Sequence, residues 1–432
     1  MPPASDAAVR FQMIKAEIHT RLVETLDLSR LNSWKPDRLR YEVRNLADQM
    51  ARNAPKDALS DTERARMVEE LLDEVFGLGP LEPLMRDPTI SDILVNGPRT
   101  VYVERRGKLE LTDIIFADDL HVMMIIQRIA ARIGRRADEM SPMVDARLPD
   151  GSRVNAIIPP VSLLGPVLSI RRFGVHLKTN DLLTNSTMTS EMLELLQAAV
   201  ASRISILISG GTGSGKTTLL NALSRFIPAD ERLVTIEDSA ELKLQQSHVI
   251  QLETKMANAE GAGEVKQRDL VRNALRMRPD RIIVGEVRGS EALDMLQAMN
   301  TGHEGSMTTI HANDTRDALT RLEMMVMMAG FELPIPVIRY YISSAITLVV
   351  QLARMKGGGR RVVKISEICG LDPAPYNVHD IFGFRQKGVR AGEAYGEFYA
   401  TGIVPQCLDR LRAAGVELDE NLFAARTLTP RE

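Results

Sequence analysis

Residues 210–217 read GGTGSGKT and fit the pattern G-x-x-x-x-G-K-[ST]. An apolar run at 204–208 precedes this loop, and a segment with helical spacing at 217–225 follows it. A strand, a glycine-rich loop and a helix in this order are the context that a phosphate-binding loop requires. The stretch therefore predicts ATP, a nucleoside triphosphate, with its magnesium ion (Mg2+) as the ligands of this chain.

Each part of the loop has a chemical task. The glycines let the backbone wrap closely around phosphates, and the backbone N–H groups and the helix N-terminus direct positive partial charge at them. Lys216 is predicted to reach the β- and γ-phosphates, and the Thr217 hydroxyl to ligate magnesium. A glycine-rich turn that binds nothing is the alternative, which the flanking strand and helix disfavour. The predicted nucleotide-binding residues are Gly211, Thr212, Gly213, Ser214, Gly215, Lys216, Thr217 and Thr218.

Composition narrows the class of protein. The chain has 432 residues, enough for about three domains, and its 44% hydrophobic and 26% charged residues are ordinary for a globular protein. A formal charge of -3 gives no overall attraction to nucleic acid or anionic lipid. Aromatic residues make up only 4%, which disfavours stacking platforms for single strands. No direct nucleic-acid partner is expected.

Cysteine usage and hydropathy predict a cytoplasmic protein. Cys369 and Cys407 are far apart in sequence and are expected to be reduced thiols, with no zinc site. The N-terminus lacks the pattern of a signal peptide. The longest apolar stretch, 342–352, is too short to span a membrane, so any membrane association is expected to go through a partner.

Hydrophobic periodicity divides the chain into three regions. Residues 1–75 are predicted to be a small helical region with a docking role; helices are expected at 10–33, 36–54 and 60–76. Residues 76–178 are predicted to form an α+β domain, with a helix at 119–133 and strands at 93–95, 101–104, 109–114, 145–148 and 153–157.

The third region, 185–432, alternates strands with helices. This alternation predicts an α/β domain with a mostly parallel sheet and helices on both faces. A mobile loop is expected at 254–267, and a turn at 356–360 is expected to join two antiparallel strands.

Two predicted strands of this region end in carboxylates, where ligands bind in parallel sheets. Glu237 follows the run 234–236 and is predicted to hold magnesium-bound water; a solvated pair with Asp238 that caps the next helix is the alternative. Glu286 follows Gly285, at which an ordinary phosphate-loop enzyme has a magnesium-binding aspartate. Glu286 is predicted to orient or activate the attacking water, against the alternative of an exposed strand-end carboxylate.

Histidine and arginine residues complete the candidate site. His311 lies at a predicted strand end and fits a γ-phosphate sensor, although a lone histidine is more often a structural hydrogen-bonding group. Four arginines of the preceding domain are either solvated or project at the nucleotide as arginine fingers, and the residues alone leave both interpretations open. They are Arg147, Arg153, Arg171 and Arg172.

Several motifs together resemble the secretion ATPase superfamily, which includes the motors of type II and type IV secretion and of type IV pili. The motifs are TIED at 235–238, LRMRPD at 275–280 leading to GEVR at 285–288, TGH at 301–303 and HAN at 311–313. They match that family's Asp box, its Walker B variant with Gly-Glu, and its His box, in order and spacing. The four-cysteine zinc module of the type II secretion branch is missing from the sequence.

Further segments look like the tight-adherence (Flp) pilus assembly ATPases of the CpaF/TadA type. They are GLGPL at 77–81, ISDILVNG at 90–97, DARLPDGSR at 145–153 and SIRRF at 169–173. The resemblance covers residues from about 10 to 425, and the helical region and the extension after 355 favour it.

This resemblance implies a homohexameric ring of subunits, each with an N-terminal domain joined flexibly to a RecA-like P-loop NTPase domain. It makes the four arginines candidate γ-phosphate contacts. It also implies a motor at the inner face of the bacterial inner membrane that assembles, and in some settings retracts, a pilus through a membrane platform protein. A type IV secretion motor that moves protein or DNA effectors is the close alternative. A nucleic-acid translocase and a non-hydrolysing scaffold fit the sequence less well.

Overall fold

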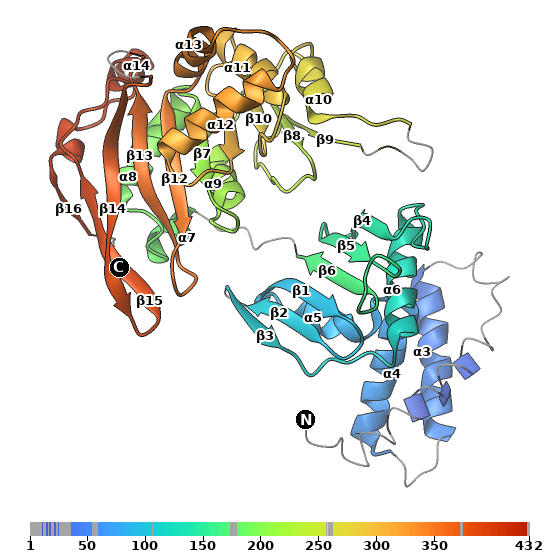
Figure 1. Cartoon of the computed structure of the whole chain (residues 1–432). Coiled ribbons are helices and arrows are strands. Elements are labelled where there is room, and N and C mark those ends of the chain that lie inside the picture. The colour runs from blue at the N-terminus through green and yellow to red at the C-terminus, as the bar shows by residue number, and fades with distance from the viewer. Residues whose placement is uncertain are drawn as a thin grey trace. The chain divides into compact units, whose positions relative to one another are not determined.

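The computed structural model divides the chain into two compact units, Met1–Gly174 and Val175–Glu432, called here the N-terminal and C-terminal units (Figure 1). It describes residues 36–53, 59–105, 107–172, 179–255, 262–371 and 375–429. It also describes a few positions outside these ranges, which are Phe11, Ile14, Lys15, Glu17, Ile18, Arg21, Leu22, Thr25 and Ala257.

Two helices begin the continuously described part of the N-terminal unit, α3 (Pro36–Asn53) and α4 (Asp61–Phe76). Ser60 caps α4: its Oγ accepts from the backbone N–H of Glu63, and the Glu63 carboxylate accepts from the N–H of Ser60. The facing apolar stripes of the two helices share one core, in which Phe11, Ile18 and Leu22 are also buried. Most of the helix expected at 10–33 lies outside the described residues, apart from the single positions named above.

An antiparallel six-stranded sheet with one covering helix forms the rest of this unit, in the strand order β3-β2-β1-β6-β5-β4. Helix α6 packs its buried residues, such as Val122 and Ile126, on alternate strand residues such as Ile93 and Ile170. The elements are η1 (Gly79–Leu81), α5 (Glu82–Arg86), β1 (Ile90–Asn96), β2 (Val101–Arg105), β3 (Lys108–Leu111), α6 (Asp119–Arg132), β4 (Met143–Arg147), β5 (Arg153–Ile157) and β6 (Val167–Arg171).

The helices predicted at 36–54, 60–76 and 119–133 and the strands predicted for this unit are present, with bounds that differ by a few residues. The strand expected at 109–114 ends at Leu111, and a turn follows in which Oγ1 of Thr112 accepts from the backbone N–H of Ile114 at 3.3 Å. Hydrogen bonds join α4 to α6: the Arg128 guanidinium donates to the carbonyls of Glu74 and Gly77. The helices and the sheet therefore belong to one contact unit, and the finer three-part division stays a prediction.

The C-terminal unit is built on a ten-stranded sheet in the order β16-β15-β14-β13-β12-β7-β11-β10-β8-β9. Its neighbours from β12 to β9 pair in parallel, and those from β12 to β16 pair antiparallel. The strands are β7 (Ile206–Gly210), β8 (Leu233–Glu237), β9 (Val249–Glu253), β10 (Arg281–Val284), β11 (Met307–Ile310), β12 (Leu348–Arg354), β13 (Arg360–Ile368), β14 (Val378–Arg390), β15 (Glu393–Ala400) and β16 (Arg426–Leu428).

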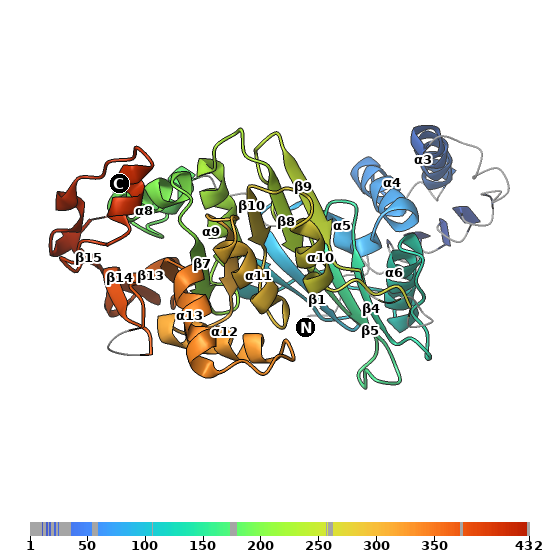
Figure 2. The same ribbon diagram turned by 90° about the horizontal axis from the view of Figure 1, so that it is seen from above.

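Helices cover both faces of the parallel part, as alternate strand residues require. Ile206 and Ile208 of β7 belong to the core with α8 and α9, while Leu207 belongs to the core with α11, α12 and α13. Figures 1 and 2 show α11, α12 and α13 gathered on one side of the sheet. The helices are α7 (Thr179–Thr184), α8 (Ser190–Ala201), α9 (Lys216–Leu223), η2 (Ser224–Phe226), α10 (Gln267–Ala274), α11 (Glu291–Asn300), α12 (Thr315–Met327), α13 (Ile335–Ala345), α14 (Leu408–Ala413) and η3 (Glu420–Phe423).

The predicted α/β fold, with a parallel sheet and helices on both faces, is confirmed. The predicted turn at 356–360 is also confirmed, because it joins β12 to β13 in antiparallel register. The helix expected over 217–225 ends at Leu223 and continues as the short η2. Part of the loop predicted at 254–267 lies outside the described residues; within the described part, Lys255 and Val265 exchange backbone hydrogen bonds.

Candidate functional site

Four neighbouring strands, β7, β11, β10 and β8, carry the predicted site residues at their carboxyl ends. Parallel strands end at the same edge of a sheet, and ligands bind outside that edge. The phosphate loop follows β7, His311 follows β11, Glu286 lies two residues after β10, and Glu237 is the last residue of β8. The sheet order therefore brings together residues that are up to about 100 positions apart in the sequence.

The phosphate loop has the backbone that its glycines predict. Gly213 and Gly215 have φ angles of 68° and 96°, in the left-handed region that favours glycine. Gly210 is required by packing instead, since a Cβ there would lie 2.5 Å from Oγ of Ser214 and 2.6 Å from the carbonyl oxygen of Leu352. Helix α9 begins directly after Gly215, so its N-terminal N–H groups face the loop.

Lys216 is buried beneath the loop and connects it to His311. Its Nζ donates to the carbonyls of Gly210 and Gly211 at 3.0 and 3.2 Å. The same Nζ lies 3.3 Å from both ring nitrogens of His311. The predicted phosphate-binding lysine and the predicted sensor histidine are thus direct neighbours.

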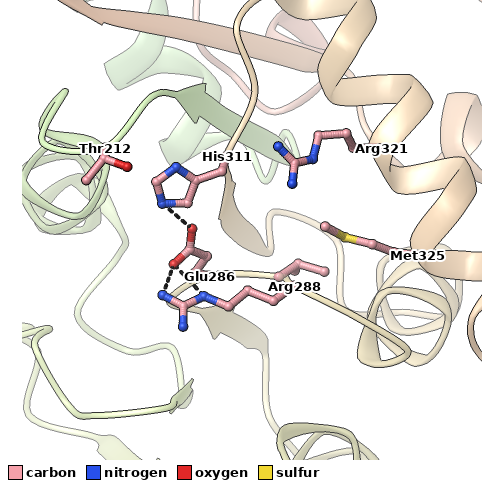
Figure 3. A pocket seen from close by; sticks show the side chains of 7 residues that line it. Thr212, Glu286, Arg288, His311, Arg321 and Met325 are labelled. Atoms are coloured by element: carbon pink, nitrogen blue, oxygen red, sulfur yellow. Dashed lines mark hydrogen bonds and ion pairs between the residues drawn. The ribbon is translucent and has the colours of Figure 1, made fainter. Parts of the chain in front are cut away.

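Glu286 joins His311 to a second cation, as Figure 3 shows. Its Oε1 lies 2.9 Å from Nε2 of His311. Its Oε2 accepts from Nε of Arg288 at 2.8 Å, and Arg288 also reaches Oδ2 of Asp238 at 3.2 Å. Arg288 therefore holds the carboxylate through Oε2, while Oε1 lies buried beside His311 without a hydrogen bond to any described residue. An oxygen left in this state beside the phosphate loop suits a group that orients water.

The surroundings of His311 favour its neutral form. Burial lowers the pKa of His311 below its usual value near 6.5, and the positive charges of Lys216, Arg288 and Arg321 lower it further, while Glu286 acts in the opposite direction. A neutral imidazole has one donor and one acceptor nitrogen, so it can hydrogen-bond a carboxylate and a second group at once.

Gly285 and Glu237 fit together across two neighbouring strands. A Cβ at position 285 would lie 2.8 Å from Cγ and 3.2 Å from Oε1 of Glu237. The buried Glu237 carboxylate therefore occupies the space that a side chain at 285 would need. Its Oε1 accepts from the backbone N–H groups of Glu241 and Leu242 at 2.9 and 3.1 Å, which orients it by means of the following loop.

The oxygen donors at this edge fit a magnesium ion that is bound together with nucleotide. They are the Thr217 hydroxyl and the carboxylates of Glu237 and Glu286, and hard oxygen ligands are those that magnesium prefers. No group of three or more His, Cys, Asp and Glu side chains with a metal-cage arrangement occurs among the described residues. A magnesium ion in a nucleotide site takes only one or two protein ligands and completes its shell with phosphate oxygens and water.

The four predicted arginines of the N-terminal unit do not form one group. Arg147, Arg153 and Arg171 are opposite one another in register on β4, β5 and β6, so they form a row on one face of the sheet. Arg172 is separate, because its Nη1 donates to the carbonyls of Asp87 and, at 3.3 Å, Ile90. That contact connects the end of β6 to the turn before β1. The finger role of all four stays a prediction.

The structure adds basic residues that the sequence interpretation missed. Nε of Arg360 on β13 donates to the carbonyl of Gly213 at 3.3 Å, and Nη1 of Arg354 on β12 lies 3.3 Å from the position of a Cβ on Gly213. Arg288 and Arg321 line a cavity of about 530 Å3 together with Thr212, Glu286 and His311. Only the GEVR motif, which contains Arg288, gave a local signal for any of them.

The other histidine of the sequence motifs lies apart from this cluster. His303 uses its Nδ1 to contact the carbonyl of Pro279 at 2.9 Å, across the loop before β10. This is a structural hydrogen bond, and it leaves His311 as the histidine that reaches the phosphate loop.

Comparison with known proteins places the chain in a family. Residues 74–369 match the family described as Type II/IV secretion system protein. The chain belongs to the type II/IV secretion system protein family. This secretion-family chain carries the phosphate loop, Glu286 and His311 within the matched range, and it is an ATP hydrolase.

Three relatives show how far the likeness extends. A Mycobacterium tuberculosis protein named for conjugal transfer is 39% identical over 317 residues, which is 71% of this chain and 89% of that protein. The type IV secretion system proteins VirB11 of Brucella suis and PtlH of Bordetella pertussis are 32% and 36% identical, over 67% and 69% of this chain and 89% and 96% of theirs. None of these three relatives is named for the assembly of tight-adherence pili.

A crystal structure of the pilus retraction motor PilT with bound ADP shares the fold. It matches 70% of this secretion-family chain and 82% of its own chain, with a TM-score of 0.50 at 20% identity.

None of the helices described in the structure is long and apolar enough to cross a membrane.

Proposed function

We propose that this chain is a cytoplasmic motor that forms a homohexamer and uses ATP hydrolysis to assemble a tight-adherence pilus through an inner-membrane platform protein. The same motor would also drive retraction of the pilus. One observation carries the enzymatic part: Lys216, His311 and Glu286 are in contact at the edge of the sheet, at 3.3 and 2.9 Å. Their contact supports a site that binds a triphosphate and activates water beside it.

The proposed roles follow from the chemistry of each group. Lys216 and the loop N–H groups bind the phosphates, and Thr217 with Glu237 holds the magnesium ion, directly or through water. When bound, that ion neutralises charge on the phosphates. Glu286 orients the attacking water, and His311 holds Glu286 in position and responds to the terminal phosphate.

Type IV secretion is the second candidate, and the names of the relatives favour it. The proteins from Mycobacterium, Brucella and Bordetella are named for conjugal transfer or type IV secretion, at 32–39% identity. The sequence motifs at 77–97 and 145–173 support the pilus interpretation instead. Deletion of the gene in its host distinguishes the two: loss of surface pili with secretion intact supports the pilus motor, and loss of DNA or effector transfer with pili intact supports the alternative.

The catalytic part is tested with Glu286→Gln in the purified full chain. The expected result is nucleotide binding close to that of the unchanged chain and hydrolysis lower by about 10²-fold or more, since a positioned base contributes that much. Asp238→Asn is the matched control, because Asp238 also pairs with Arg288 but does not contact His311. Full hydrolysis in Glu286→Gln would show that another group orients the water.

A further inference from the structure

Arg321 lines the cavity that Thr212, Glu286 and His311 also line, and the proposed mechanism gives this arginine no role. It lies on α12, which is anchored to the sheet by the fully buried Leu319 and Leu322. Arg321 itself is exposed and lines the cavity beside the phosphate loop. Within the described part of the chain, no carboxylate pairs with it and no hydrogen bond of its side chain is found.

The direction of the helix brings this side chain to the site. Helix α12 begins at Thr315, four residues after His311, and helical side chains incline toward the N-terminus of their helix. The Arg321 guanidinium is therefore directed back toward the end of β11. Figure 3 shows its guanidinium pointing toward the side on which His311 lies.

Among the described residues that line the cavity, the carboxylate of Glu286 is already engaged and Arg321 has no anionic partner. Glu286 already contacts Arg288 and His311, and Arg288 also contacts Asp238. Lys216 lies behind His311, so the wall near the phosphate loop is positive. A guanidinium is a planar fork of donors that matches phosphate oxygens, and an unpaired one in a cavity favours binding of such an anion.

We propose that Arg321 binds a phosphate group with three unbridged oxygens, from within the same chain that carries the phosphate loop. The group is either the terminal phosphoryl of bound ATP or the inorganic phosphate that hydrolysis releases. This proposal rests on the proposed ATPase function and adds a contact residue to that site. It gives the site a cis cation on α12, independent of the arginines of the N-terminal unit.

The test compares Arg321→Gln and Arg321→Lys with Arg316→Gln in the purified full chain. Arg316 lies on the same helix and is exposed, but it does not line the cavity. Binding is measured for a non-hydrolysable ATP analogue, for ADP and for inorganic phosphate as a competitor, next to steady-state hydrolysis. Thermal unfolding checks that each variant is folded.

If Arg321 binds the terminal phosphoryl, Arg321→Gln weakens binding of the ATP analogue by about ten-fold or more and leaves ADP binding unchanged. If it binds released phosphate, competition by inorganic phosphate weakens and binding of the ATP analogue does not. Arg321→Lys keeps part of either effect, and Arg316→Gln shows neither.

Two outcomes overturn the proposal. One is unchanged binding of all three ligands in Arg321→Gln; the other is an equal loss for the ATP analogue and ADP, which would mean a general effect on the site. Failure of the ATPase function itself is distinguishable, because the unchanged chain would then neither bind the ATP analogue nor hydrolyse ATP.

Discussion

At the scale of single residues, the glycine before Glu286 is explained by its neighbour on the next strand. The Glu237 side chain fills the space that a side chain at position 285 would need. The backbone at 285 lies outside the left-handed region, and packing alone demands the glycine. We propose that Glu237 supplies from β8 the carboxylate that other phosphate-loop enzymes have at position 285.

Gly285→Ala tests this pairing. The added Cβ displaces the buried Glu237 carboxylate, so we expect hydrolysis to fall several-fold and the magnesium concentration for half-maximal rate to rise. The measurement is a magnesium titration of the rate. Gly289→Ala is the control, because a Cβ there has its nearest neighbour at 3.4 Å, which is ordinary contact. If the magnesium dependence of the rate is unchanged in Gly285→Ala, Glu237 does not contribute to magnesium binding.

The lowered pKa of His311 predicts where kcat/KM falls on the acidic side of its pH profile. Because burial and the charges of Lys216, Arg288 and Arg321 outweigh the attraction of Glu286, the pKa of His311 is lowered and the imidazole stays neutral to a lower pH than that of an ordinary histidine. It is protonated only at lower pH, so kcat/KM, which reports the free enzyme, should hold its plateau below pH 6.5. Loss of a neighbouring cation raises the pKa of His311.

Arg321→Gln should therefore move the acid limb to higher pH, and Arg316→Gln should leave it in place. The measurement is the pH dependence of kcat/KM for ATP in all three proteins. An acid limb at or above pH 6.5 in the unchanged chain would contradict the neutral form of His311.

At the scale of elements, the hairpin of β12 and β13 packs against the phosphate loop and hydrogen-bonds to it. Arg354 and Arg360 face each other across the hairpin, and Arg360 bonds the carbonyl of Gly213. The tip of the hairpin is itself connected to the next hairpin, because the N–H of Ala394 donates to the carbonyl of Lys356. The antiparallel extension of the sheet thus reaches the nucleotide loop.

Replacement of Arg360 by Met should weaken ATP and ADP binding alike, by a few-fold, because it removes one hydrogen bond that holds the loop. Arg361→Met is the matched control, since that guanidinium donates to the carbonyls of Asn185 and Arg360 instead. Nucleotide titration of both variants decides the matter. Equal affinities in the two variants would show that the hairpin contact does not support binding.

A buried ion pair joins the segment just before β8 to the first residue of β10, at the amino ends of these strands. Arg281 is fully buried and its guanidinium donates to both carboxylate oxygens of Glu231, and to the carbonyl of Val200. Glu231→Leu leaves this charge without its carboxylate and should lower the free energy of unfolding by about 3–5 kcal/mol. Glu304→Gln, in the exposed pair of Glu304 with Arg410, should cost about 1 kcal/mol or less. Denaturant unfolding of both variants checks the difference.

At the scale of the whole molecule, the chain consists of two units, and the sequence predicts that both contribute to hydrolysis. Arg147, Arg153 and Arg171 form a row on one face of the N-terminal sheet, and within this row Nε of Arg147 donates to the nearby carbonyl of Gly151 at 3.4 Å. Arg172 differs in that it joins the end of β6 to Asp87 and Ile90, which lie more than 80 positions earlier in the sequence. The two kinds of arginine should therefore respond differently to substitution.

We expect Arg147→Gln, Arg153→Gln or Arg171→Gln to lower kcat, at least one of them by about ten-fold or more, with little change in ADP binding or stability. Arg172→Gln should instead lower the unfolding temperature of the N-terminal unit. The assays are hydrolysis against chain concentration and thermal unfolding. Full activity in all of the first three variants would show that none of these arginines acts as an arginine finger.

Much of the fold and part of the site could be predicted from the sequence. The phosphate loop, the strand-end carboxylates and His311 carry local patterns, because backbone angles, burial periodicity and strand ends are short-range properties. Arg321, Arg354 and Arg360 carry none, since an arginine on a helix or strand is usually solvated. Only the tertiary structure shows that these three lie beside the loop.

The sequence by itself determined the ligand class, the order of helices and strands and the parallel sheet, because these depend on residue types at fixed short spacings. The tertiary structure alone decided that Glu237 fills the space at Gly285, and that α12 and the β12–β13 hairpin turn basic side chains toward the phosphate loop. The physical reason is that strand adjacency and side-chain direction result from packing between segments tens of residues apart, which no local pattern encodes.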